Sequence, residues 1–178
     1  LLFAVLLAFY FYPFYNMKGQ VVMIDVGQGD CFFIQQPFHK GNILIDTGGL
    51  KNTDVATKRI IPYLESQGVF SLDAVFVSHQ DFDHCGALES LKTHFKVKEV
   101  IESFKEKRIG NLHFKNLALD KRYVSENDRS SIIYVTINHL NYLFTGDISK
   151  EVEKDLYQMY QKLEVDVLKV AHHGSKSS

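Results

Sequence analysis

The chain has 178 residues, of which 46% are hydrophobic and 23% are charged, a composition typical of a globular domain with a sizeable core. The formal net charge of -1 is evidence against a strongly basic nucleic-acid surface, although a local patch can hide in the average. Two cysteines, Cys31 and Cys85, are too few for a disulfide framework.

The chain begins with an uncharged apolar segment, Leu1 to Tyr15, which is shorter than the roughly 20 residues that span a bilayer as a helix. Its aromatic residues from Phe9 to Tyr15 stand directly before Asn16-Met17-Lys18, where an interfacial aromatic belt would lie. Because the sequence starts abruptly at Leu rather than Met, we expect residues 1–15 to be the end of a transmembrane helix. The alternatives are the apolar core of a signal peptide and a buried helix.

Three strands are predicted in the first third of the chain, at 20–26, 31–35 and 42–46. The turn Gly27-Gln28-Gly29-Asp30 separates the first two strands, and the loop 37–41 separates the second from the third. This opening is therefore expected to be a β-meander.

The hydrophobic period then changes. Three helices are predicted, at 55–68, 86–94 and 148–163. Strands are predicted at 74–78, which is continuously apolar like a strand buried on both faces, and at 98–101 and 165–171. A mixture of hairpins with strand-helix-strand units favours sheets covered by helices, an α/β sandwich.

The region between these units is less regular. Residues 102–126 are polar, with strand character only near Leu112 and Phe114. A hairpin is predicted from strands at 131–137 and 142–145, joined by Asn138-His139-Leu140-Asn141.

Four side chains of the types that ligate metals follow the strand at 74–78 directly: His79, Asp81, Asp83 and His84. Functional sites in such sheets collect at the carboxyl ends of strands. His79 and Asp81 can point in one direction from an extended turn, and the other two can serve a second ion close by. Imidazole and carboxylate together suit Zn²⁺ or Mn²⁺. The alternative is a polar loop that is merely rich in His and Asp.

Two later motifs stand in the same setting after strands. Asp147 in Thr145-Gly146-Asp147 precedes a predicted helix, where it would serve either as an N-cap or as a carboxylate that bridges two metals. His172-His173-Gly174-Ser175 follows the last strand. Because adjacent side chains diverge, we expect one of the two histidines to ligate while the other orients it or meets substrate. A structural pair of histidines is the alternative.

These motifs, in this order, resemble the metallo-β-lactamase-fold domain of the ComEC competence proteins, multi-pass membrane proteins that take up transforming DNA. Asp25-Val26-Gly27-Gln28-Gly29-Asp30 and Ile45-Asp46-Thr47-Gly48-Gly49 are also similar to early motifs of that family. The resemblance covers residues 20–178. It implies a metallo-β-lactamase αββα sandwich that is incomplete at its C-terminus and follows a membrane segment.

The resemblance also implies a site with two divalent ions, Zn²⁺ or Mn²⁺. His79 and Asp81 would hold one ion, and Asp147 would bridge both. The other ion would be held by Asp83, His84 and one of His172 and His173. Asp83, Asp147 and His84 would be the catalytic residues, while Asp46 would support the ligand loop from behind.

Two departures from the wider superfamily bear on the first ion. Asp81 stands where most members have His, which makes the site harder and richer in oxygen. Most members also supply a His before the strand that leads to the bridging Asp, whereas this chain has the run 126–131 there. Asn127 or Asp128 could replace that His as a weaker oxygen ligand, so the first ion would be loosely held.

The function that the resemblance implies is a metal-dependent nuclease at the bacterial cell membrane, on an unspecified side, which degrades the DNA strand that is not imported. A carboxylate-rich site favours phosphodiesters over β-lactams. The implied partners are DNA, the membrane-embedded remainder of the same protein and other components of the DNA-uptake machinery. The alternatives are a phosphodiesterase or phosphorylcholine esterase with another substrate, or a non-catalytic DNA-binding or coupling module of the channel.

Overall fold

The computed structural model describes residues 1–12, 18–118 and 123–175, and two five-stranded sheets form its centre. The first sheet has the order β1-β2-β3-β5-β7, with the bounds β1 Gln20–Met23, β2 Phe32–Gln35, β3 Asn42–Ile45, β5 Ala74–Phe76 and β7 Val100–Ile101. The second has the order β12-β11-β10-β9-β8, with the bounds β12 Val167–Lys169, β11 Leu140–Phe144, β10 Ile133–Ile137, β9 Leu112–Asn116 and β8 Glu106–Ile109. A small parallel pair joins β4 (Ser71–Leu72) to β6 (Lys96–Val97).

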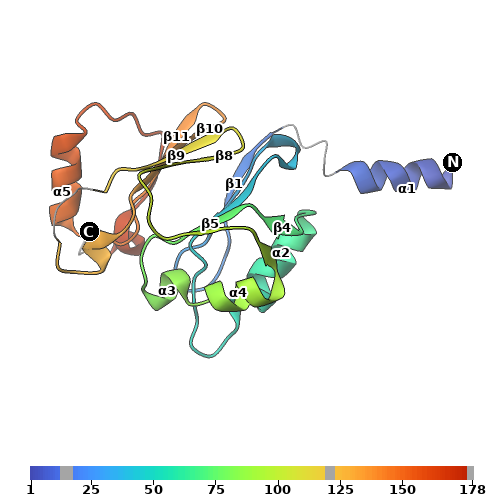
Figure 1. The fold of residues 1–178 in the computed structure, drawn as a ribbon, viewed down its shortest axis with the longest axis horizontal. Coiled ribbons are helices and arrows are strands. Elements are labelled where there is room, and N and C mark those ends of the chain that lie inside the picture. The colour runs from blue at the N-terminus through green and yellow to red at the C-terminus, as the bar shows by residue number, and fades with distance from the viewer. Residues whose placement is uncertain (13–17, 119–122, 176–178) are drawn as a thin grey trace.

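Helices flank both sheets (Figure 1). The α-helices are α1 Leu2–Phe11, α2 Ile61–Ser66, α3 Phe82–Cys85, α4 Leu88–His94 and α5 Lys150–Met159. A π-helical turn, η3 (Ala56–Ile60), runs directly into α2, and short 3₁₀ turns occur at η2 (Pro37–His39), η4 (Asn127–Arg129) and η5 (Ala171–Gly174). The predicted helix at 55–68 is therefore confirmed as η3 followed by α2.

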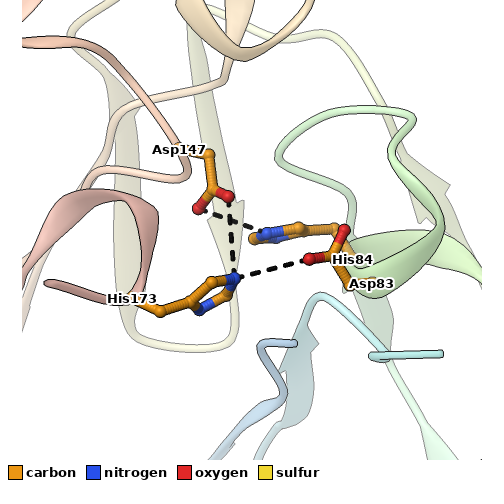
Figure 2. Close-up of side chains that lie close together, drawn as sticks. All are labelled: Asp83, His84, Asp147 and His173. Atoms are coloured by element: carbon orange, nitrogen blue, oxygen red, sulfur yellow. Dashed lines mark ion pairs between the residues drawn. The ribbon is translucent and has the colours of Figure 1, made fainter. Parts of the chain in front are cut away.

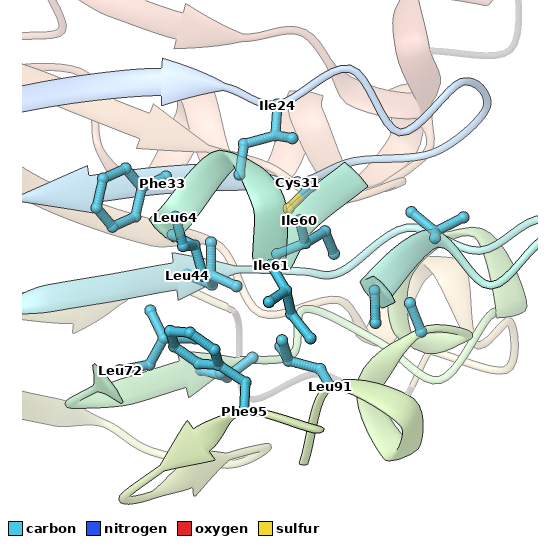
Figure 3. Packing of buried hydrophobic residues seen from close by; sticks show 14 of the residues in the cluster. Ile24, Cys31, Phe33, Leu44, Ile60, Ile61, Leu64, Leu72, Leu91 and Phe95 are labelled. Atoms are coloured by element: carbon cyan, nitrogen blue, oxygen red, sulfur yellow. The ribbon is translucent and has the colours of Figure 1, made fainter. Parts of the chain in front are cut away.

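Every residue of the central strands β3 and β5 is buried. Because successive side chains of a strand point in opposite directions, each of these strands contributes side chains to two different cores. Leu44 of β3 packs with Ile60, Leu64 and Leu91 in the core between the first sheet and the helices (Figure 3). Its neighbours in β3, Ile43 and Ile45, pack instead in the core between the two sheets.

The core between the sheets collects side chains from both of them, including Phe76 of β5, Phe114 of β9 and Val135 of β10. On the far side of the second sheet, Leu143 of β11 packs with residues of α5 in a third core. The layers therefore run helices, sheet, sheet, helix, which confirms the expected αββα sandwich.

The chain differs from the prediction in two hairpins. Residues 102–126 contain a strand that the sequence did not show, β8, which pairs with β9 in an antiparallel hairpin. The sequence of β8 is Glu-Lys-Arg-Ile, so it has no alternation of apolar and polar side chains. The hairpin of β10 and β11 is closed by two residues rather than four, because Ile137 pairs directly with Leu140.

This two-residue turn yields a test of local strain. Asn138 and His139 both have positive φ, 51° and 68°, as a type I′ turn requires, and such turns favour Gly at the second position. We expect His139→Gly to raise the free energy of unfolding by about 0.5–1 kcal/mol, because it removes a left-handed residue that bears a side chain. Urea denaturation measures this change.

The matched variant is Asn138→Gly. Asn138 Nδ2 donates a hydrogen bond of 2.8 Å to the carbonyl oxygen of Gly19, which Gly cannot replace. This variant should gain less than His139→Gly or lose stability. Equal gains from both substitutions would contradict the explanation.

Helix α1 has no buried residue, and Figure 1 shows it apart from the sheets. Within the described parts of the chain, no helix is both long enough and apolar enough to cross a membrane. The expected transmembrane end at 1–15 stays a prediction, and residues 13–15 lie outside the described residues.

Candidate metal centre

The candidate metal centre lies where two pairs of parallel strands end. Strands β3 and β5 pair with Ile45 opposite Phe76, and β11 and β12 pair with Phe144 opposite Lys169. Because parallel strands end at the same edge of a sheet, the loops that follow them meet there. The sandwich brings the two edges together, so the first sheet and the second sheet contribute side chains to one site.

Four of the predicted ligands come together at this edge: Asp83, His84, Asp147 and His173 (Figure 2). One ligand atom from each lies within 4.8 Å of the others. His173 Nε2 is 3.5 Å from Asp83 Oδ2 and 3.6 Å from Asp147 Oδ2. His84 Nε2 is 3.3 Å from Asp147 Oδ1. We call these four residues the ligand set.

Two imidazole nitrogens indicate that the site fits a metal ion. The Nε2 atoms of His79 and His84 are buried, and neither has a hydrogen-bond partner in the described part of the chain. A buried polar atom without a partner costs about 1–3 kcal/mol. Coordination of a divalent ion by the ligand set would satisfy Nε2 of His84, and two imidazoles with two carboxylates are a donor set that zinc and manganese accept.

Asp46 fixes the orientation of His84 from behind. Its Oδ1 accepts a hydrogen bond of 2.7 Å from the backbone N–H of Ser78. Its Oδ2 accepts one of 2.7 Å from the Ser78 hydroxyl and lies 2.8 Å from His84 Nδ1. With Nδ1 engaged by a carboxylate, Nε2 of His84 is the atom left to face the ligand set.

Charges within the site shift two pKa values strongly. Burial alone would lower the pKa of His84, but the carboxylates of Asp147 and Asp46 outweigh burial and raise it to about 10. Burial alone would raise the pKa of Asp147, but His84 and Lys169 hold it well below the ordinary carboxyl value. Asp147 is therefore ionised, as a metal ligand must be, and an incoming ion must displace the proton from His84.

His79 and Asp81 lie beside the ligand set but do not complete a second one. His79 Nε2 is 3.6 Å from Asp81 Oδ2, and the centres of the His79 and His84 rings are 4.1 Å apart. Burial and the charge of His84 lower the pKa of His79, so its imidazole is biased toward the neutral form that ligates. Among the residues that the structure describes, no group of three ligands within reach of one ion includes His79 or Asp81.

Neither of the two predicted weak ligands belongs to the ligand set, and the side chain of Asp128 is engaged at the start of α5. Asp128 Oδ1 accepts a hydrogen bond of 2.9 Å from the backbone N–H of Ser149, and the carbonyl oxygen of Asn127 accepts one of 2.6 Å from Ser130 Oγ. Ser149, rather than Asp147, stands at the N-cap position of α5. The N-cap alternative for Asp147 is therefore wrong.

The two adjacent histidines take different places. His173 joins the ligand set, whereas His172 does not belong to it. Both have left-handed backbone, with φ of 50° at His172 and 53° at His173. Strained residues of this kind cluster at functional sites, which supports a functional position for this turn.

Sequence reasoning missed two residues of the site, Asp30 and Lys169. Asp30 is buried, and Lys169 Nζ contacts its Oδ2 and lies 3.3 Å from Asp147 Oδ1. Asp30 ends the motif Asp25-Val26-Gly27-Gln28-Gly29-Asp30, but nothing in that motif indicates that its side chain reaches the site. A signal for Lys169 was present, because it is a single cation within the apolar run of β12.

The comparisons with known proteins agree with this geometry. The sequence model of the metallo-beta-lactamase superfamily matches residues 24–129, more than half of the chain. The chain belongs to the metallo-beta-lactamase superfamily, and it has the fold of metal-dependent hydrolases.

Three curated relatives are named for the ComE operon, for recombination and for competence. ComE operon protein 3 of Bacillus subtilis is 31% identical over 98% of this chain and 28% of its own length. Recombination protein 2 of Haemophilus influenzae is 30% identical over 89% of this chain and 22% of its own, and competence protein ComA of Neisseria gonorrhoeae is 28% identical over 90% and 24%. The chain spans about a quarter of the length of these relatives. The resemblance to ComEC-type proteins is thereby confirmed.

Solved structures are similar in fold. A metallo-beta-lactamase from Cronobacter sakazakii superposes with a TM-score of 0.60 and 14% identity over 90% of this chain and 76% of its own. A subclass B3 metallo-beta-lactamase isolated from a soil metagenome library gives 0.61 and 15% over 89% and 78%. At such low identity these structures establish the fold alone.

Proposed function

We propose that this domain is a metal-dependent phosphodiesterase that cuts DNA. The observation that carries the proposal is the ligand set, in which two carboxylates and two imidazoles from both sheets meet at the edge of a metallo-beta-lactamase fold. Asp81 and Asp30 add further oxygens beside it. Oxygen-rich sites suit hard divalent ions, which in turn bind phosphoryl oxygens well.

The relatives supply the choice of DNA among phosphodiesters. Three of them are named for competence or recombination, processes in which DNA is handled. By that similarity, we propose that the domain degrades the strand that is not imported. It would do so as part of a membrane-embedded DNA-uptake channel that includes the remainder of the same protein and further uptake components.

The burial of the ligand set indicates from which side a substrate approaches. The side chains of His84 and Asp147 are 0% and 5% exposed, whereas those of His173 and Asp83 are 32% and 30% exposed. Divalent ions, when bound, supply an activated water and neutralise charge on the phosphoryl group. The buried pair, His84 and Asp147, would hold the ion from the interior of the domain. Asp83 and His173 would lie at the surface that the phosphodiester reaches.

The test is cutting of DNA by the purified chain with Mn²⁺ or Zn²⁺, compared with the variant Asp83→Ala. We expect the chain to cut DNA only with metal. Asp83→Ala should abolish cutting while DNA binding, measured by a gel-shift assay, stays intact, because it removes one ligand at the exposed side of the site. The control is Glu89→Ala, which removes an exposed carboxylate of α4 that pairs with Lys92 and does not belong to the ligand set.

Each alternative has its own outcome. A chain that hydrolyses small phosphodiesters or phosphorylcholine esters with metal but leaves DNA intact is an esterase of another substrate class. A chain that binds DNA and cuts nothing with either metal is a non-catalytic module. Either outcome would overturn the proposed nuclease.

A further inference from the structure

Asp30 stands behind His173, on the side of the imidazole that faces away from the ligand set. Its Oδ1 lies 3.3 Å from His173 Nδ1, while His173 Nε2 faces Asp83 and Asp147. A carboxylate at Nδ1 favours the tautomer that carries its proton there, which leaves the lone pair of Nε2 available to a metal. Asp46 occupies the same place at His84, so both imidazoles of the ligand set have a buried carboxylate at the same ring atom.

Lys169 holds the other oxygen of Asp30. Its Nζ contacts Asp30 Oδ2, lies 3.3 Å from Asp147 Oδ1 and donates a hydrogen bond of 2.7 Å to the carbonyl oxygen of Gly146. An ammonium has three donors, and these three acceptors account for them. Because Lys169 binds one oxygen of each carboxylate, Asp30 Oδ1 is directed at His173 Nδ1 and Asp147 Oδ2 at His173 Nε2.

The backbone turn that carries Asp30 packs closely against the backbone of Asp83. Gly29 has φ of 105°, and a Cβ on it would collide with the carbonyl oxygen of Asp83. The backbone N–H of Asp30 donates to that same oxygen at 3.2 Å. The turn is therefore hydrogen-bonded to Asp83, a member of the ligand set, so the position of Asp30 depends on the position of that residue.

We infer that Asp30 and Lys169 are a positioning pair that sets the tautomer of His173 and the orientation of Asp147 for metal binding. The inference rests on the metal centre of the proposed function but does not depend on the substrate. Lys169 locks the carboxylate of Asp30, Asp30 locks the imidazole of His173, and Lys169 also fixes the oxygen of Asp147 that faces away from His173.

The sharpest variant is Asp30→Asn, which keeps the shape of the side chain and removes its charge. Lys169 still attracts the remaining oxygen, so the new amide NH₂ turns toward His173 Nδ1. Nδ1 must then accept, and the proton moves to Nε2, where it blocks the metal. The expected result is an inverted His173 tautomer in ¹⁵N NMR of the metal-free full chain at alkaline pH. Affinity for Mn²⁺, measured by titration calorimetry, should fall by about 10–100-fold.

The double variant Asp30→Asn/Lys169→Met tests the part played by Lys169. Without the ammonium, the amide can turn its oxygen to His173, so the Nδ1–H tautomer should return even though both charges are gone. This variant also leaves no buried ammonium without the Asp30 carboxylate, which is what Asp30→Asn alone does. The matched controls are Asp25→Asn and Lys98→Met, which alter exposed ion pairs with Arg59 and Asp73 and should change neither the tautomer nor the affinity.

The outcomes separate positioning from mere stability. A ring that keeps its tautomer in Asp30→Asn, together with unchanged Mn²⁺ affinity of the folded chain, would overturn the inference even if the melting temperature fell. If the double variant does not restore the Nδ1–H tautomer, Lys169 has no part in positioning His173. Because neither measurement uses DNA, a failure of the proposed nuclease would leave these results intact.

Discussion

Replacing Asp147 by Ala is expected to lower the affinity for Mn²⁺ and Zn²⁺ by more than about 100-fold, beyond the loss that follows removal of an outer partner of a ligand. Asp147 Oδ1 lies 3.3 Å from both His84 Nε2 and Lys169 Nζ, and its Oδ2 lies 3.6 Å from His173 Nε2. Asp147 therefore contacts both imidazoles of the ligand set. Titration calorimetry of the metal-free chain measures the loss.

Two further variants make this result specific. Asp147→Asn keeps the size of the side chain and should lose nearly as much affinity, because charge rather than volume holds the ion. Glu151→Ala removes an exposed carboxylate of α5 and should leave the affinity unchanged. Retention of tight binding in Asp147→Ala would show that the ion, if bound, is held elsewhere.

Replacing Asp46 by Ala is expected to lower the free energy of unfolding by about 3–5 kcal/mol, the range seen when one partner of a buried charged pair is removed. Asp46 is 2% exposed and accepts from the Ser78 backbone, the Ser78 hydroxyl and His84. Ala would leave all three groups buried without this acceptor. Urea unfolding of the metal-free chain measures the change, which separates it from any loss of metal binding.

The conservative variant Asp46→Asn should cost less. An amide oxygen can still accept from Ser78, and Asn tolerates the φ of 59° at this position better than most residues. Asp25→Ala removes an exposed carboxylate paired with Arg59 and should cost only about 0–1 kcal/mol. If Asp46→Ala costs no more than this control, the support attributed to Asp46 is wrong.

Sequence patterns predicted most of the layers and much of the site because both depend on local order. Leu44 and Val75 lie in continuous apolar runs, and such runs mark strands that are buried on both faces. The run from His79 to His84 follows such a strand, and the edge of the sheet is where ligands gather. The sequence therefore predicts which residues of the first sheet contribute to the site.

The remaining features depend on contacts between distant parts of the chain. Nothing in the sequence near Asp30 says that Lys169 will meet it, since the pair forms only when the two sheets pack together. The choice of His173 over His172 follows from the left-handed turn, which adjacent identical residues cannot reveal. Strand β8 is held by its pairing with β9, and its own charged residues give no strand signal.

The ligand set draws one half from each sheet: Asp83 and His84 follow β5, while Asp147 and His173 follow β11 and β12. Between the sheets lies the apolar core that includes Phe76 and Phe114. An ion bound to both halves would link the two sheets, because all four ligands can reach it only while the sheets are packed together. Docking and ion binding are then thermodynamically linked, so whatever tightens one tightens the other.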